Sequence, residues 1–203
     1  SNLKSFNNVF RHSQLSSLID DTDTSILNSV TNVTLSKKIT PTLNTAAGHN
    51  VYFNNALYNP HSEHNKSAGG ITTSSGFFVS GDTTNEQFFD DDGNGNIRRY
   101  YLVGVVRTYT DETAGTIDYS TGDIKINSLN IISISDVDDV TSTTIRITEI
   151  PDSKDIVPVR NQILEIDMTN STVSGEIDTI AVGAAGASSS YTTSTSYTPT
   201  KSF

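Results

Sequence analysis

The sequence predicts an α+β fold that is predominantly β, with antiparallel hairpins and short strands, one or two N-terminal helices and a low-complexity C-terminal tail. Ser, Thr and Asn are abundant, and their short polar side chains favour turns and strand surfaces over helix interiors. Short apolar runs alternate with polar residues at the two-residue period of a half-buried strand. Segments rich in Asp, Asn and Gly separate these runs, as hairpin loops require.

The N-terminal region shows helical spacing instead. Apolar side chains recur every three or four residues over residues 3–10 and again over residues 15–19. We expect Ser13 to cap the second of these two helices, which runs towards Asp20.

Strands are expected along most of the remaining chain, each bounded by turn-forming residues. The segments are residues 30–39, Val51–Tyr58, Ile97–Val106, Ile131–Ile134, Thr144–Ile147 and Ile163–Met168, with Val173–Val182 as a weaker candidate.

The acidic run from Asp90 to Asn96 is interpreted as a hairpin turn. Clustered Asp, Asn and Gly tolerate the positive φ angles of tight loops, and Arg98 and Arg99 follow where they can neutralise the acidic loop. A calcium loop of the EF-hand type needs a Glu at its twelfth position, which Tyr101 occupies here. The turn is therefore favoured over a calcium site.

A second hairpin is predicted over residues 117–126. We place its loop at residues 120–123, with Gly122 in the left-handed conformation. This register pairs Tyr119 with Ile124 and Ile117 with Ile126 on one face, and Asp118 with Lys125 on the other.

Composition excludes several classes of function. The net charge of −10 repels phosphates and anionic lipids, so nucleic acid and membrane are not expected partners. There is no cysteine, which excludes disulfides and thiolate metal sites. No apolar run approaches the roughly 20 residues of a transmembrane helix. The chain begins at Ser1, not at Met, and we expect it to be a piece of a longer protein.

Candidate chemistry is sparse. His61 and His64 could place two imidazoles near one metal, but no carboxylate stands at a recognised zinc spacing, and solvated histidines are favoured. Neither a nucleophile elbow, a phosphate loop nor a dinucleotide fingerprint is present. We expect no catalytic residue, no cofactor and no metal.

Residues 1–183 are expected to form one β-rich assembly domain, with a possible subdivision near residue 110. Residues 184–203 are almost entirely Ala, Gly, Ser, Thr and Tyr, which cannot bury a core alone, so we expect a tail that orders only against a partner. Tyr191, Tyr197 and Phe203 are its bulky side chains, and they are the candidate interface residues.

Three segments carry a resemblance to a known family. They are Ile-Asp-Asp-Thr-Asp-Thr-Ser-Ile at 19–26, the Gly115–Ile126 hairpin, and Ile-Pro-Asp-Ser-Lys-Asp-Ile-Val-Pro-Val-Arg-Asn-Gln-Ile-Leu-Glu-Ile-Asp at 150–167. In these segments the chain resembles the C-terminal part of the baseplate wedge protein (gene product six) of T-even-like phages with contractile tails.

The resemblance implies a structural, non-enzymatic component of the virion tail baseplate, made in the host bacterial cytoplasm. It implies pairing with a second copy, assembly of the pairs into a ring around the hub, contacts with other wedge proteins and a part in the switch to sheath contraction. A receptor- or carbohydrate-binding tail fibre or adhesin module is the alternative, because such modules share this composition. A tail hydrolase, the third class, would need a cleft with paired carboxylates.

Overall fold

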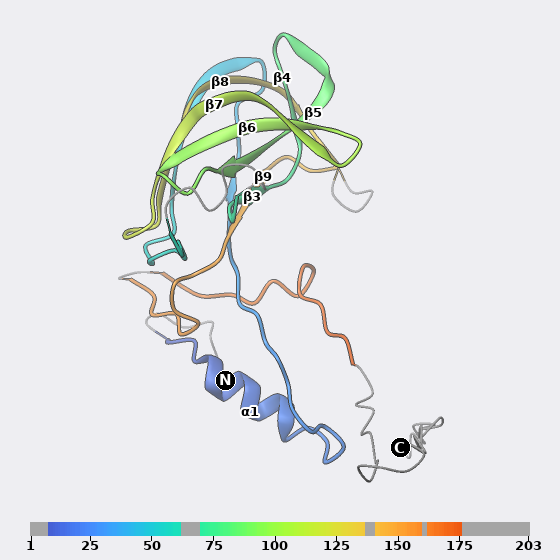
Figure 1. Ribbon diagram of the computed structural model, residues 1–203, viewed down its shortest axis with the longest axis vertical. Coiled ribbons are helices and arrows are strands. Elements are labelled where there is room, and N and C mark those ends of the chain that lie inside the picture. Colours follow the sequence, from blue (N-terminus) through green and yellow to red (C-terminus); the bar gives the residue numbers. More distant parts are fainter. Residues whose placement is uncertain (1–7, 62–69, 137–140, 160–161, 176–203) are drawn as a thin grey trace, which may run out of the picture. The chain divides into compact units, whose positions relative to one another are not determined.

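The structure is a computed structural model that describes residues 8–61, 70–136, 141–159 and 162–175 (Figure 1). The chain divides into two compact units, residues 1–165 and residues 166–203. Almost all described secondary structure in the first unit is antiparallel β, which confirms the predominantly β fold class.

The described elements follow one another along the first unit. They are α1 (His12–Asp20), β1 (Leu35–Ile39), β2 (Thr45–Tyr52), β3 (Thr73–Ser74), β4 (Phe77–Val79), β5 (Asp82–Asp91), β6 (Asn96–Val103), β7 (Val106–Asp118), β8 (Asp123–Ile134) and β9 (Ile145–Glu149).

Five strands close into a small barrel. The larger sheet has the order β2-β8-β4-β5-β6-β7, and β7 also pairs with β8, the second strand in this order, so the sheet closes on itself. One edge of β8 carries β7 along its first half, where Ile117 lies opposite Ile124, and β4 along its second half, where Val79 lies opposite Ile131. The other edge of β8 carries β2. β2 is therefore the one strand of this sheet outside the closed ring.

A second sheet, with the order β1-β9-β3, lies on the concave side of the arch that β6, β7 and β8 form in Figure 1. Its central strand β9 points Ile145, Ile147 and Glu149 into the interior, where all three side chains are buried. The shared apolar core includes Ile39, Val51, Phe77, Phe89, Ile97, Ile117, Ile124, Ile126, Ile131, Ile145 and Ile147.

The turn between β5 and β6 confirms the interpretation of the acidic run. The carboxylate of Asp92 accepts hydrogen bonds from the backbone N–H of Asn94 (2.8 Å) and of Asn96 (3.0 Å). Gly93 and Gly95 take φ angles of 76° and 97°, which L residues with a side chain rarely adopt. Side chain and glycines together fix the hairpin.

The β7–β8 hairpin exists, but its predicted register is wrong by two residues. Ile117 lies opposite Ile124 and Asp118 opposite Asp123, while Lys125 lies opposite Thr116, so the expected pair of Asp118 with Lys125 does not form. A slip of two residues keeps every side chain on its own face, because side chains alternate along a strand. The isoleucines are therefore buried as expected.

Local turn chemistry explains the slip. The carboxylate of Asp118 accepts a hydrogen bond from the Ser120 N–H (2.9 Å), and the Asp118 carbonyl accepts one from the Gly122 N–H (2.8 Å). The loop therefore covers residues 119–122. Gly122 has a φ of 75°, as predicted, and a Cβ there would lie 2.3 Å from the Asn55 carbonyl oxygen.

Several other boundaries differ from the predictions. The strand expected at Val51–Tyr58 is β2, which ends at Tyr52, and only the last five residues of the segment 30–39 form β1. The segments expected at Ile131–Ile134 and Thr144–Ile147 are the end of β8 and most of β9. β7 runs unbroken through residue 110.

The helix prediction is confirmed in part. α1 begins at His12 with Arg11 at the N-cap, so Ser13 lies inside the helix and does not cap it. Residues 8–10 are not helical, and the rest of the first expected helix lies outside the described residues.

In the second unit, the described residues 166–175 contain a turn at Asp167. Its carboxylate accepts hydrogen bonds from the backbone N–H groups of Thr169 and Asn170, each at 3.2 Å. The strand predicted at Ile163–Met168 is absent from the described residues, which is a correction to the prediction. Residues 173–175 are not a strand either, and 176–182 lie outside the described part.

Candidate interaction surfaces

A buried ion cluster braces one side of the barrel. Asp90 lies opposite Arg98 across the β5–β6 hairpin and is fully buried. Arg98 Nε and Nη2 donate to the two carboxylate oxygens of Asp90 at 3.0 and 3.1 Å. Arg107 Nη1 (2.6 Å) and the Tyr109 hydroxyl (2.8 Å) donate to Asp90 Oδ2 from β7. One carboxylate thus joins the strands β5, β6 and β7. Its hydrogen bonds to the two guanidinium groups are charge-assisted, and such bonds are stronger than those between neutral groups.

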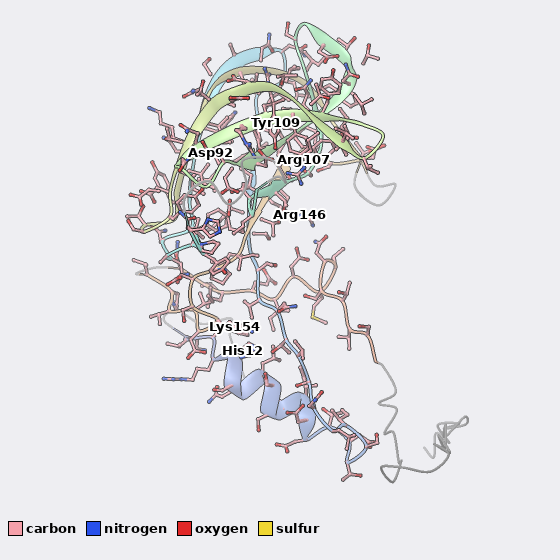
Figure 2. The ribbon with its side chains drawn as sticks, viewed as in Figure 1. His12, Asp92, Arg107, Tyr109, Arg146 and Lys154 are labelled. Atoms are coloured by element: carbon pink, nitrogen blue, oxygen red, sulfur yellow. The ribbon has the colours of Figure 1, made fainter. Side chains whose placement is uncertain are left out.

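Aromatic rings cover the two guanidinium groups. Arg98 lies 4.1 Å from the centre of the Tyr109 ring, and Arg107 lies 4.6 Å from that of Tyr100. Arg107 and Tyr109, both labelled in Figure 2, belong to β7. Burial and the hydrogen bond to Asp90 raise the pKa of Tyr109 to about 12, so its hydroxyl keeps its proton and stays a donor.

Arg99 does not share this role. It points to the other face of β6, lies opposite Asp111 on β7, and burial lowers its pKa while the Asp111 charge raises it. Of the two arginines predicted to neutralise the acidic segment, only Arg98 pairs with Asp90.

A second buried polar group lies between β5, the β7–β8 loop and β9. Asp91 accepts hydrogen bonds from the Tyr119 hydroxyl (2.6 Å) and from the Thr72 N–H (2.8 Å). Glu149 is 1% exposed, and within the described residues its Oε1 has no hydrogen-bond partner. Burial, aided by the negative charge of Asp91, raises the pKa of Glu149 to about 8, while the nearby Thr72 hydroxyl lowers it. Glu149 is accordingly protonated at neutral pH.

These clusters do not form a metal centre. Within the described ranges, no group of three or more His, Cys, Asp or Glu side chains is placed to hold a metal ion. His61 is exposed, and His64 lies outside the described residues. The hydrogen bonds of Asp90 instead join β5 to β6 and β7, and those of Asp91 join β5 to Thr72 and to the β7–β8 loop.

The braced strands β6 and β7 end in an apolar tip. Leu102, Val103, Val105 and Val106 are exposed around Gly104, and Val105 is 95% exposed. Gly104 has a φ of 63°, which permits the tight reversal. Clustered exposed aliphatic side chains of this kind mark contact surfaces. This hairpin tip is the apolar surface of the barrel itself.

Residues 8–34, 150–159 and 162–165, which we call the extension, lie outside the barrel, and the first of these segments binds the second. Phe10 and Ile156 exchange two backbone hydrogen bonds of 2.9 Å. The Asp155 carboxylate accepts a hydrogen bond from the His12 N–H at the start of α1 (2.9 Å), where no local side chain caps the helix. Thr31 O accepts from the His12 ring and from Lys154, both labelled in Figure 2.

The extension exposes apolar side chains that no described residue covers. In α1 none of the residues is buried. Val30 is 85% exposed and Leu27 70% exposed. The other exposed aliphatic side chains of the extension are Leu18, Ile150, Val157, Val159 and Ile163. An isolated helix without a buried face gains little from tertiary packing, so this surface favours a partner.

The interface residues proposed from the sequence are not placed by the structure. Tyr191, Tyr197 and Phe203 lie outside the described residues. Sequence reasoning missed the apolar tip, although its signal is the uncharged run Leu-Val-Gly-Val-Val at 102–106. No helix in the described part of the chain has the length and apolarity that crossing a membrane requires.

The fold and these surfaces define a β-rich module with exposed apolar contact surfaces. Residues 1–38 match the family model of the baseplate structural protein gp6, C-terminal domain III. The matched segment contains α1 and most of β1, and it confirms over these residues the resemblance to the C-terminal part of that protein. The match supports a structural component of a phage tail baseplate. No curated protein and no solved structure matches the chain.

Proposed function

We propose that this chain is a wedge subunit of a contractile phage tail baseplate, which pairs with a second copy of itself. In this proposal the pairs build a ring around the hub, bind other wedge proteins and take part in the switch to sheath contraction. The subunit is made in the host bacterial cytoplasm and has no catalytic role, no cofactor, and neither nucleic acid nor membrane as a partner.

One observation carries the proposal: the family-matched segment exposes apolar side chains that no described residue covers. Leu18, Leu27 and Val30 all lie within residues 1–38 and are exposed. Asp155 and Lys154 hold this segment to the second part of the extension through His12 and Thr31. A fixed apolar surface loses less conformational entropy on binding than a loose one.

Self-association through this surface requires that the two copies bury enough surface area between them. A stable dimer buries on the order of 1,200–2,000 Å² in total, with an apolar centre and a polar rim. The aliphatic side chains of the extension supply such a centre, and the surrounding Asp and Ser residues supply the rim. An isologous pair is the simplest closed arrangement for identical chains. We further propose that Tyr191, Tyr197 and Phe203 pack across to the neighbour.

Sedimentation equilibrium or light scattering at tens of micromolar protein tests the proposal. We expect a mass of twice 21.9 kDa for the unmodified chain. The double variant Leu27→Glu and Val30→Glu should be monomeric, because charges at an apolar centre must be desolvated. Val105→Glu, at the hairpin tip, is the matched control and should leave the dimer intact. A wild-type chain that is strictly monomeric contradicts the self-association.

The alternative, a carbohydrate-binding fibre or adhesin module, would need exposed aromatic side chains gathered in one place. Among the described residues, Tyr52 and Tyr58 are the exposed aromatic side chains, and each occupies a different segment. This favours the baseplate proposal.

A further inference from the structure

The outer edge of β2 is open. β8 occupies one edge of β2 from Thr45 to Tyr52, and no other described strand pairs with it. The Phe53 N–H donates to Gly122 O, on the β8 side. Backbone groups alternate in direction along an antiparallel strand, so the N–H and C=O groups of Asn50 and Tyr52 point away from β8. They are free to accept another strand.

The edge lacks most of the usual protection. Natural proteins guard edge strands with Lys, Pro, inward charges, β-bulges or very short length. The pairing of β2 with β8 is irregular between Ala47 and His49, and the register from His49 to Tyr52 is regular. β2 has eight residues, Thr-Ala-Ala-Gly-His-Asn-Val-Tyr, and contains no Lys, Arg, Asp, Glu or Pro. A long uncharged edge of this kind is a ready template for strand addition.

A groove runs beside this edge, and its charge is positive. It lies between β1 and β2 and is lined by Lys37, Lys38, Asn50, Tyr52, Asn54 and Gln162, with Ile39 and Val51 at its floor. The two lysines are its charged residues, both are exposed, and neither forms an ion pair with another described residue. In a chain of net charge −10, this is a local positive surface beside free backbone donors.

A further cation, Arg146 on β9, lies opposite Lys38 but does not line the groove. Lys38 lies directly opposite Arg146 in the β1–β9 pair, and both are on the face of that sheet that points away from the core. Like charges directly opposite each other destabilise a sheet unless an anion lies between them. A bound carboxylate would remove this repulsion.

We infer that the free edge of β2 takes up an extended acidic peptide segment of a different protein as an added strand, with its carboxylates on Lys37 and Lys38. The occupant is not a second copy of this edge. Two β2 strands paired about a two-fold axis would bring four lysines together, and like charges across an interface oppose association. Tyr52, which is 51% exposed, gives the added strand an apolar contact.

The test uses the full chain labelled with ¹⁵N and three synthetic peptides. The first has the sequence Thr-Glu-Val-Asp-Val-Glu-Thr with blocked ends. The second has lysine at the three acidic positions, and the third keeps the acids but has proline at both valines. We expect only the first to bind, to protect the amides of Asn50 and Tyr52 from hydrogen exchange, and to weaken as salt is raised.

The variant Lys38→Glu should weaken binding of the acidic peptide about tenfold, since an attraction becomes a repulsion. Arg11→Glu is the matched control, because it makes the same change of charge at an exposed residue of the extension and should bind as wild type does. If Lys38→Glu lowers the melting temperature, Lys38→Gln replaces it, with a smaller loss expected.

Four outcomes overturn the inference. They are equal binding of the acidic peptide to wild type and Lys38→Glu, equal binding of the proline peptide, no binding at millimolar peptide, and protection of Asn50 and Tyr52 that rises with protein concentration alone. The last would assign the edge to a second copy. The peptide assay does not depend on whether the extension dimerises, so it is independent of the mass measurement above.

Discussion

Asp90 and Arg98 face each other across the β5–β6 hairpin and form a buried, two-point ion pair, with Nε–Oδ1 and Nη2–Oδ2 distances of 3.0 and 3.1 Å. Arg98 also donates to the Asp91 carbonyl at 2.8 Å, so one side chain satisfies the carboxylate and the backbone beside it. Because Arg107 and Tyr109 reach the same carboxylate from β7, this pair fixes the position of the strands that carry the apolar tip.

Replacing Asp90 with Ala should lower the free energy of unfolding by about 3–5 kcal/mol, because two guanidinium groups lose their buried counter-charge. Urea unfolding monitored by circular dichroism measures the change. Asp123→Ala removes an exposed carboxylate in the same barrel and should cost less than about 1 kcal/mol. Equal losses in the two variants would mean that the cluster adds no stability beyond general charge effects.

Part of this arrangement could be predicted from sequence. The hairpins at Asp90–Asn96 and around Gly122 depend on residues within the turn, and local chemistry decides them. Arg98 was correctly assigned to the acidic segment because it lies eight residues beyond Asp90 on the returning strand. The two other side chains that donate to Asp90, Arg107 and Tyr109, could not be predicted, since they belong to β7, whose register with β6 contains two irregularities.

Long-range pairings could not be predicted. Closure of the barrel depends on β8 pairing with β4 and β7 on one edge, and these contacts are set by the packing of the whole core. The segment Ile163–Met168 alternates like a strand, but the carboxylate of Asp167 accepts from the N–H groups of Thr169 and Asn170 and forms a turn at the end of this segment. The interface residues Tyr191, Tyr197 and Phe203 remain a prediction.

Substitutions of Tyr119 test whether its side chain is packed on the inner face of the β7–β8 hairpin. It packs against the core, and its hydroxyl donates to Asp91 at 2.6 Å. Tyr119→Phe removes only a hydrogen bond to a charged group and should cost about 1.5–3 kcal/mol. Tyr119→Ala also leaves a cavity and should cost more than Tyr119→Phe, about 2–4 kcal/mol. Thermal melts of both variants give the order, and an unchanged melt for Tyr119→Ala would place the ring in solvent.

Glu149 should make the stability depend on pH. Its folded pKa of about 8 lies above its ordinary value of 4.5, so the folded state keeps a proton that the unfolded state releases. Below about pH 4.5 the side chain is protonated in both states and the free energy of unfolding is unaffected by its titration. As pH rises from there through 8, the free energy of unfolding falls progressively.

Glu149→Gln removes this titration while keeping the shape of the side chain. The difference in unfolding free energy between the variant and wild type should grow in favour of the variant from pH 5 to pH 9. Urea unfolding at several pH values measures it, with Glu112→Gln as an exposed control that should show no such trend. A difference that stays constant with pH would mean that Glu149 is ionised in the folded protein.

The hydrogen bond between Asp155 and His12 gives the last prediction. Asp155 acts as an N-cap from 143 positions away, and its negative charge also lies at the positive end of the helix dipole. Asp155→Ala should therefore loosen α1 by about 1 kcal/mol without unfolding the barrel, because the barrel core does not include Asp155. Hydrogen exchange read residue by residue should become faster in α1 and stay unchanged in β8. Asp152→Ala removes a carboxylate three residues earlier, where the backbone N–H binds Ala56 O, and should leave α1 protected as in wild type. Faster exchange in both variants would show that charge near the extension, and not the cap, holds the helix. If the cap does hold it, Asp155→Ala should also weaken the proposed self-association, since the surface that carries Leu18 would no longer be fixed before binding.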